Sequence, residues 1–141
     1  MKKLTLVFII AVTSALLFAC APAPKETSIE VSCDDFTKSQ HISKEMEVAV
    51  GGLFTVTLCS NPTTGFSWSE LARIGDQSVL QQTDHKFIAP QAKGMMGAPG
   101  NEVWTFKAFK KGQTIISMEY GRPWEGGEKD AWTFNLTVVV K

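Results

Sequence analysis

The sequence predicts an all-β domain, folded as an immunoglobulin-like β-sandwich of seven to eight strands. Two observations lead to this prediction. Beyond residue 28, apolar and polar side chains alternate along short segments, and long stretches with the 3.6-residue period of a helix are missing. Turn residues separate these segments at short intervals, as they do in two-sheet sandwiches. A closed barrel would produce the same pattern and is the alternative.

The first half of the domain is expected to contain five strands. The clearest is Leu53–Ser60, where apolar residues alternate with Thr55 and Thr57, and Gly51-Gly52 marks the turn before it. The weakest is Val79–Phe87, which is followed by a proline. The five expected strands span Ile29–Cys33, Glu45–Val50, Leu53–Ser60, Phe66–Leu71 and Val79–Phe87.

The second half is expected to contain three strands in which aromatic residues keep step with aliphatic ones. Lys110–Gln113 reads as the hairpin turn between the first two of them. No helix is evident, so we interpret the acidic residues Asp34-Asp35 and those within Glu125–Asp130 as solvated turn residues. The three expected strands span Glu102–Phe109, Thr114–Tyr120 and Ala131–Val140.

The first 19 residues have the three-part layout of a secretory signal peptide. Lys2 and Lys3 precede an apolar stretch, Leu4–Ala19, whose end contains small residues. The stretch is short for a membrane-spanning helix, and the Ala-Pro-Ala-Pro sequence after Cys20 would not continue one. We therefore predict that residues 1–19 are a signal peptide, absent from the mature protein, rather than an anchor helix.

The sequence Leu17-Phe18-Ala19-Cys20 resembles the lipobox of bacterial lipoproteins, in which cleavage precedes a cysteine that becomes lipid-modified. We therefore expect Cys20 to be the lipidated N-terminus, residues 20–28 to be a flexible tether and residues 29–141 to be the domain. A single acyl chain binds a protein only marginally to a membrane, whereas the several acyl chains of a lipoprotein anchor it stably. The expected location is the outer face of the cytoplasmic membrane or the cell envelope. The alternative is an ordinary signal peptide that ends at a cysteine.

Length, charge and cysteine content restrict the function classes. Cleavage after residue 19 leaves 122 of the 141 residues, enough for one domain with its own core. This part carries 12 basic and 14 acidic residues, and no basic patch points to nucleic acid as a partner. Besides Cys20 there are two cysteines, and an even number in an exported protein suggests a disulfide. Against it, Cys33 is in step with the apolar positions of its strand and Cys59 is not, so the pairing stays open.

The sequence contains no evident catalytic or metal-binding constellation. The only histidines are His41 and His85, and neither has a ligand-like spacing with Cys, Asp or Glu. Cys59 has no histidine nearby in the sequence to serve as its base. We therefore expect no enzymatic activity, no metal and no other cofactor.

Three connections between strands contain residues that turn formation alone does not require. Each has a plain structural explanation: Asn-Pro and Gly make a turn, methionines can end a core strand, and a tryptophan can fold back onto its sheet beneath a stacked arginine. Together they indicate a binding surface, because glycine-rich loops without charged tips lose little solvation against another protein. The three connections are Asn61–Gly65, Gly94–Gly100 and Gly121–Gly127.

In this order, the three loops resemble those of the chagasin family of cysteine protease inhibitors, whose members carry NPTTG, GxGG and RPW motifs. The first motif is complete as Asn61-Pro62-Thr63-Thr64-Gly65, followed by the aromatic residues Phe66 and Trp68. The third is complete as Arg122-Pro123-Trp124. The second is imperfect, because Gly97-Ala98-Pro99-Gly100 has a proline where the family has glycine. The resemblance extends over about Glu45 to Val140.

The resemblance implies a sandwich whose binding loops cluster at one end and enter the active-site cleft of papain-like proteases as a wedge. Thr63 and Thr64, with the backbone of Pro62 and Gly65, would then lie nearest the protease's catalytic cysteine. Arg122 and Trp124 would pack on the primed side of the cleft, and Gly97–Gly100 along the other side. Inhibition would be tight and reversible, since no scissile bond is presented, and the inhibitor is expected to be a monomer.

The resemblance leaves the target open, because the protease could be the cell's own or a foreign one. An alternative from another class is a non-inhibitory immunoglobulin-like module of the cell envelope. Such a binding or assembly lipoprotein would use the same three loops to recognise a peptide or an envelope partner.

Overall fold

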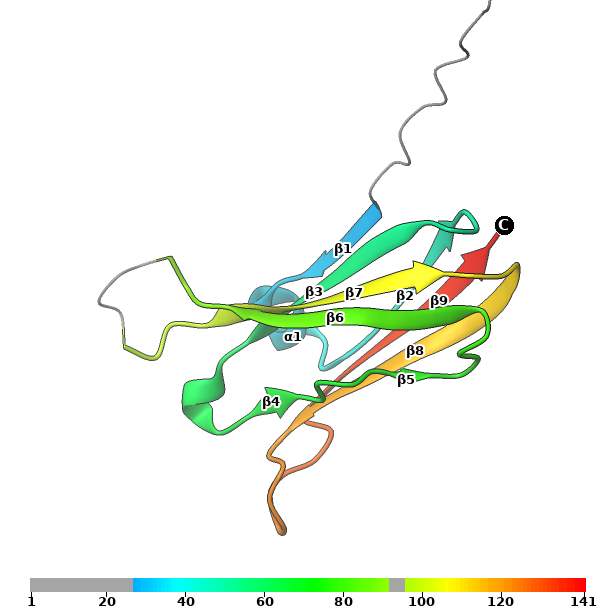
Figure 1. Cartoon of the computed structure of the whole chain (residues 1–141). Coiled ribbons are helices and arrows are strands. Elements are labelled where there is room, and N and C mark those ends of the chain that lie inside the picture. The colour runs from blue at the N-terminus through cyan, green and yellow to red at the C-terminus, as the bar shows by residue number, and fades with distance from the viewer. Residues whose placement is uncertain (1–26, 92–95) are drawn as a thin grey trace, which may run out of the picture.

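The computed structural model describes residues 27–91 and 96–141, and these residues form a two-layer β-sandwich (Figure 1). The expected signal peptide and Cys20 lie outside the described residues. The first strand begins at Thr27, inside the segment expected as a tether, because Thr27 already pairs with Phe54. Within the two described ranges, no helix has the length and apolar character needed to cross a membrane.

The strands are divided between two sheets. The order is β1-β3-β7-β6 in the first sheet and β2-β9-β8-β4 in the second, with β5 also paired to β8. β1 is parallel to β3 and β2 is parallel to β9, whereas the other pairs are antiparallel. The strands are β1 (Thr27–Val31), β2 (His41–Val48), β3 (Leu53–Ser60), β4 (Ser67–Trp68), β5 (Arg73–Ile74), β6 (Leu80–Ile88), β7 (Gly100–Ala108), β8 (Gly112–Gly121) and β9 (Trp132–Val140).

The core lies between the two sheets and consists of the inward-facing residues of each strand. In β3, β7, β8 and β9 the buried side chains follow the alternation that the sequence predicts. Trp104, Phe106 and Phe54 are fully buried, and the rings of Phe54 and Phe106 stack with centroids 5.3 Å apart. Burying each such side chain contributes about 2–3 kcal/mol. The predicted all-β sandwich is confirmed, with nine strands in the described part.

Two strands differ from the prediction. The strand expected at Phe66–Leu71 is reduced to β4, and β5 was not expected. Both are only two residues long, which is too short for alternation to reveal. The chain between them is held instead by a side chain, because Gln82 accepts a hydrogen bond from the backbone N–H of Ala72 at 2.9 Å.

The interpretation of Asp34-Asp35 as turn residues was wrong, because they lie in the first turn of α1 (Cys33–Lys38). Ser32 caps this helix: its hydroxyl accepts from the backbone N–H of Asp35, whose carboxylate accepts from the backbone N–H of Ser32 at 3.0 Å. This reciprocal pair is the capping box. The helix buries Phe36, which stacks on Trp132 with centroids 4.9 Å apart.

The same helix explains how two cysteines that are out of step come together. Cys33 is the first residue of α1 rather than the last residue of a strand, so strand alternation does not fix its direction. The structure joins it to Cys59 in a disulfide, with Cα atoms 5.1 Å apart. Cys59 is buried, although it is out of step with the core positions of β3. The bond therefore fastens α1 to β3.

Candidate functional site

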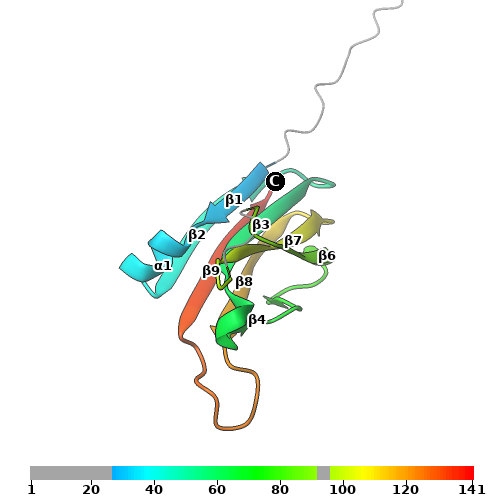
Figure 2. The ribbon, with the colours of Figure 1, turned by 90° about the vertical axis from the view of Figure 1, so that its left-hand side faces the viewer.

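The three sequence-predicted loops leave the strands at the same end of the sandwich (Figures 1 and 2). The first connects β3 to β4, the second connects β6 to β7, and the third connects β8 to β9. Residues 92–95 of the second loop lie outside the described residues. We call this end the loop end and the three connections the β3–β4, β6–β7 and β8–β9 loops.

The β3–β4 loop is a compact turn of 3₁₀ helix, η1 (Pro62–Thr64), closed by Gly65. Gly65 has a φ of 79°, the left-handed conformation predicted for this glycine, and its N–H donates to the Pro62 carbonyl. Both threonines are exposed and both donate their hydroxyl hydrogen to Asn61, Thr63 to Oδ1 at 2.6 Å and Thr64 to the carbonyl at 2.7 Å. The tip is therefore uncharged and internally braced.

Asn61 also ties this tip to two other parts of the molecule. Its side-chain Nδ2 donates to the carbonyl of Gly97 in the β6–β7 loop at 2.9 Å. Its backbone N–H donates to the Tyr120 hydroxyl, near the end of β8, at 2.9 Å. The sequence indicated Asn61 as a turn residue, but its link to the second loop and the part played by Tyr120 were missed. Hydrogen-bond partners that lie this far away in sequence give no local signal.

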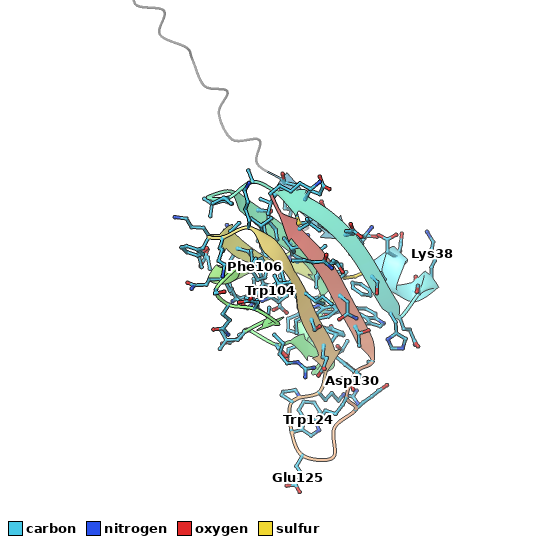
Figure 3. All side chains as sticks on the ribbon, turned by 90° about the vertical axis from the view of Figure 1, so that its right-hand side faces the viewer. Lys38, Trp104, Phe106, Trp124, Glu125 and Asp130 are labelled. Carbon is cyan, nitrogen blue, oxygen red and sulfur yellow. A yellow bond between two sulfur atoms is a disulfide. The ribbon has the colours of Figure 1, made fainter. Side chains whose placement is uncertain are left out.

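Trp124 joins the third loop to the first. It lies against Gly65 so closely that a Cβ on this glycine would be 2.6 Å from Cη2 of the indole. The Trp124 side chain is nevertheless 51% exposed, in a loop that projects from the sandwich (Figure 3). Only a glycine at position 65 therefore permits this contact, and the outer part of the ring stays available to a partner.

Arg122 lies between two aromatic rings. Its guanidinium carbon is 4.5 Å from the ring centroid of Phe66 and 5.8 Å from that of Trp124. Such cation–π contacts add about 0.5–1 kcal/mol at exposed sites. The stacked arginine that the sequence suggested is thus present. The tryptophan, however, packs on the neighbouring loop rather than on its own sheet, and it remains half exposed.

Lys129 holds the third loop closed from within, and the sequence did not single it out. Its Nζ donates to the carbonyls of Arg122 at 2.5 Å and Trp124 at 2.9 Å. Two backbone bonds act alongside it, from the N–H of Arg122 to Glu128 and from the N–H of Gly127 to Trp124. Lys129 could have been noticed in the sequence as a lysine that follows the glycines at which the loop reverses direction.

The β6–β7 loop reaches the site through its second half. Gly97 has a φ of 84°, Pro99 is exposed, and Gly100 begins β7. A Cβ at Gly100 would lie 2.4 Å from the Ile88 carbonyl, so the root of this loop is tightly packed. Met96 is completely exposed beside Gly97. An unbranched apolar side chain in that position is typical of protein interfaces.

A buried polar cluster lies at the roots of two loops. The Ser60 hydroxyl donates to Glu102 Oε1 at 2.6 Å, and His85 Nε2 lies 2.8 Å from Oε2 of the same carboxylate. The three residue types are those of a hydrolase triad, but the carboxylate separates the hydroxyl from the imidazole, and Ser60 is fully buried. The cluster therefore cannot activate a nucleophile, and it instead links the strand ends that carry Asn61 and Gly100.

Comparison with known proteins agrees with this geometry. The sequence model of the chagasin family of peptidase inhibitors, I42, matches residues 47–138, which include all three loops. The chain belongs to the chagasin family. Chagasin from Trypanosoma cruzi is 32% identical to it over 103 residues, which cover 72% of this chain and 91% of chagasin. The family resemblance expected from the three motifs is confirmed.

Solved structures share the fold of this chagasin-family chain. A cysteine protease inhibitor from Entamoeba histolytica superposes with a TM-score of 0.65 at 23% identity, covering 84% of this chain and all of that one. The inhibitor PbICP-C, solved in complex with falcipain-2, has a TM-score of 0.57 at 14% identity, covering 82% and 98% of the two chains. Members of the family are inhibitors rather than enzymes, in agreement with the buried polar cluster described above.

Proposed function

We propose that this chain inhibits papain-like cysteine proteases reversibly, by inserting the three braced loops into the active-site cleft. The observation that carries the proposal is the mutual packing of the loops: Asn61 bonds to Gly97, and Trp124 packs on Gly65. Three family motifs separated in sequence thereby become one surface. The structure offers nothing in favour of the alternative, a non-inhibitory envelope module.

The roles of individual residues follow from the shape and chemistry of the loop end. The β3–β4 tip, with Thr63 and Thr64, would enter closest to the catalytic cysteine. Trp124 and Arg122 would lie on the primed side, and Gly97 to Gly100 on the other side. A tip without charge can fill such a cleft by van der Waals contact and hydrogen bonding, and it presents no strained or activated peptide bond for acylation. Binding would therefore be reversible.

Bracing favours tight binding because the loops lose little conformational entropy on docking. Each immobilised side chain or ordered loop otherwise costs about 0.5–1.5 kcal/mol at an interface. Here the two threonine hydroxyls, Asn61 and Lys129 already have their hydrogen-bond partners before any protease is present.

The direct test is titration of papain and of a cathepsin L-like protease with residues 21–141. Within residues 27–91 and 96–141, the buried core residues lie between Val31 and Val140, so residues 21–141 retain them. Trp124→Ala should weaken inhibition by about 30-fold, the usual cost of truncating a central aromatic anchor, and Thr63→Arg should obstruct the tip. Leu71→Ala, at an exposed residue outside the loops, is the control. Full protease activity at micromolar inhibitor would refute the proposal.

We also propose that the mature protein is attached to a membrane through lipid on Cys20. The support is the lipobox-like sequence before this cysteine. Cys20→Ser should move the protein from the membrane fraction to the soluble fraction of cells that express it. Unchanged partitioning would refute the attachment without affecting the proposal of protease inhibition, which residues 21–141 test alone.

A further inference from the structure

The end of the sandwich opposite the loops carries a second surface. There the β2–β3 turn and the β7–β8 turn lie side by side, because the N–H of Gly51 donates to the Ala108 carbonyl at 2.8 Å and the N–H of Ala108 to Gly52 at 2.9 Å. The chain enters β1 beside this end, since Thr27 is paired with Phe54, next to Leu53 (Figure 1). We call it the tether end.

Three large apolar side chains are exposed at the tether end. Val50 is 46% exposed, Leu53 49% and Phe109 45%. Single exposed apolar residues are ordinary on protein surfaces, but Val50 and Phe109 lie in the two adjoining turns and Leu53 begins β3 directly after one of them. Leu53 is opposite Lys107 in the register of β3 and β7, two residues from Phe109. Because the three residues lie at neighbouring positions of one end of the sandwich, we treat them as one apolar patch.

Three lysines of β7 and the β7–β8 turn lie beside this apolar patch. Lys107 Nζ lies 5.4 Å from the ring centroid of Phe109, and Lys110 and Lys111 follow in the same turn. In the described ranges, no carboxylate forms an ion pair with these three lysines. Of the acidic groups nearby, Glu47 is paired with Lys141, and Asp76 lies within electrostatic reach of Lys110. The tether end is thus net positive, although the mature part carries more acidic than basic residues.

We propose that the tether end is a docking surface for the headgroup layer of an anionic lipid membrane. Apolar and aromatic side chains partition into the boundary between headgroups and acyl chains. Each lysine next to an anionic leaflet is attracted by the negative surface potential of the lipid headgroups. The patch that we name the membrane patch therefore consists of Val50, Leu53, Lys107, Phe109, Lys110 and Lys111.

The length of chain before β1 is what selects a membrane as the occupant, and this step depends on the proposed lipid on Cys20. Six residues lie between Cys20 and Thr27, so the two Cα atoms are at most about 25 Å apart. A lipid on Cys20 therefore holds the tether end close to the bilayer. The resulting high effective concentration of lipid headgroups allows even weak contacts to contribute to binding. The three inhibitory loops then face away from the membrane, toward an approaching protease.

A second copy of the chain fits the patch less well. A two-fold dimer through this surface would bring the three unpaired lysines of each copy toward those of the other, and like charges in close apposition oppose association. An anionic leaflet offers the complementary charge instead.

The test is flotation of residues 21–141 with vesicles, which measures the patch without any lipid on the protein. We expect binding to vesicles of equal parts phosphatidylglycerol and phosphatidylcholine at 50 mM NaCl, weaker binding at 200 mM, and none to pure phosphatidylcholine. Lys110→Glu with Lys111→Glu should weaken binding by about 30-fold, and Phe109→Ser should weaken it further. The matched control, Lys38→Glu with Lys44→Glu, has the same net charge outside the patch and should bind nearly as well as the parent.

Each contrary outcome has a definite meaning. Absence of binding to anionic vesicles, or equal weakening by the two double variants, would overturn the proposal. Self-association in sedimentation experiments that is lost with the Lys110 and Lys111 changes would overturn it in favour of an interface between copies. Papain inhibition by the same preparations reports separately on the loop end, and the fractionation of Cys20→Ser reports separately on the lipid.

Discussion

The two ends of the sandwich are built from the same strands, yet their connections are held in different ways. At the tether end, short turns are closed by backbone hydrogen bonds, such as that from the N–H of Gly52 to the Ala49 carbonyl. At the loop end, Asn61 and Trp124 hold longer connections to one another, and Lys129 closes the β8–β9 loop from within. Backbone bonds suffice for turns that many sequences could form. A binding surface assembled from several loops requires particular side chains. The residues that define this surface are therefore found at the loop end, where side chains brace the loops.

The disulfide gives the largest expected effect and acts on the whole sandwich rather than on one end. Cys33→Ser with Cys59→Ser should lower the free energy of unfolding by about 3 kcal/mol, since the bond spans 26 residues and such a crosslink restricts the unfolded chain. Denaturant unfolding measures this. Inhibition of papain at 25 °C should change little, because Cys59 precedes the loop and makes no contact in the tip. A stable double variant that no longer inhibits would show that the bond positions the loop.

Two left-handed glycines, Gly65 at the loop end and Gly51 at the tether end, allow a matched comparison of the ends. Gly65→Ala should weaken inhibition by about 30-fold, because its Cβ would displace the Trp124 anchor. Gly51→Ala, at a φ of 80° in the tether end with no atom near the added Cβ, introduces similar backbone strain without displacing a side chain. It should reduce stability and leave the inhibition constant unchanged. Equal weakening by the two variants would mean that strain, rather than Trp124, is responsible.

Lys129 tests whether bracing contributes to inhibition. Lys129→Met removes both hydrogen bonds to the β8–β9 carbonyls and should weaken inhibition by about tenfold, since two such bonds contribute about 1–2 kcal/mol. Lys129→Arg should restore part of it, and Lys111→Met at the tether end should have no effect in solution. The inhibition constants are to be measured with the melting temperatures. A large fall in melting temperature for Lys129→Met would assign this lysine to stability instead.

The smallest expected effect concerns pH and α1. Hydrogen bonds from the side chain and backbone of Ser32 hold the pKa of Asp35 below its usual value near 3.8. A depressed carboxylate pKa stabilises the fold above the unfolded pKa, and this contribution is lost as the pH falls through the folded value. Asp35→Asn should therefore show a shallower loss of stability between pH 5 and pH 2 than the parent, as followed by thermal unfolding. Identical profiles would mean that the capping box contributes nothing measurable.

The sequence was sufficient for the sandwich because alternation in long strands reflects burial directly. Leu53–Ser60 was predicted with its observed bounds, and the three loop motifs were found as local strings of residues. The short elements could not be predicted from alternation or helical periodicity. β5 has two residues, and α1 has six, so neither displays its period. The capping pattern of Ser32 and Asp35 was nevertheless present in the sequence and could have indicated the helix.

The contacts between the loops could not be predicted from local sequence. Asn61 and Gly97 are 36 residues apart, and the Lys129 contacts depend on how the β8–β9 loop closes. Ser60, His85 and Glu102 have no recognisable spacing, because the register of β3, β6 and β7 brings them together. Pairings of this kind follow from strand register, which is decided by the whole sheet rather than by any segment.

If the proposed lipid on Cys20 holds the chain to a membrane while a protease is bound, the disulfide also shortens the path along which force is transmitted. Tension entering at Thr27 loads β1 along its length, in shear against the parallel strand β3. It then crosses from Cys33 directly to Cys59, two residues before Asn61. The segment from α1 through β2 is thereby left out of the load path. A pull between the anchor and the β3–β4 loop would then reach the loop through β1 and one covalent bond, without passing through α1 and β2.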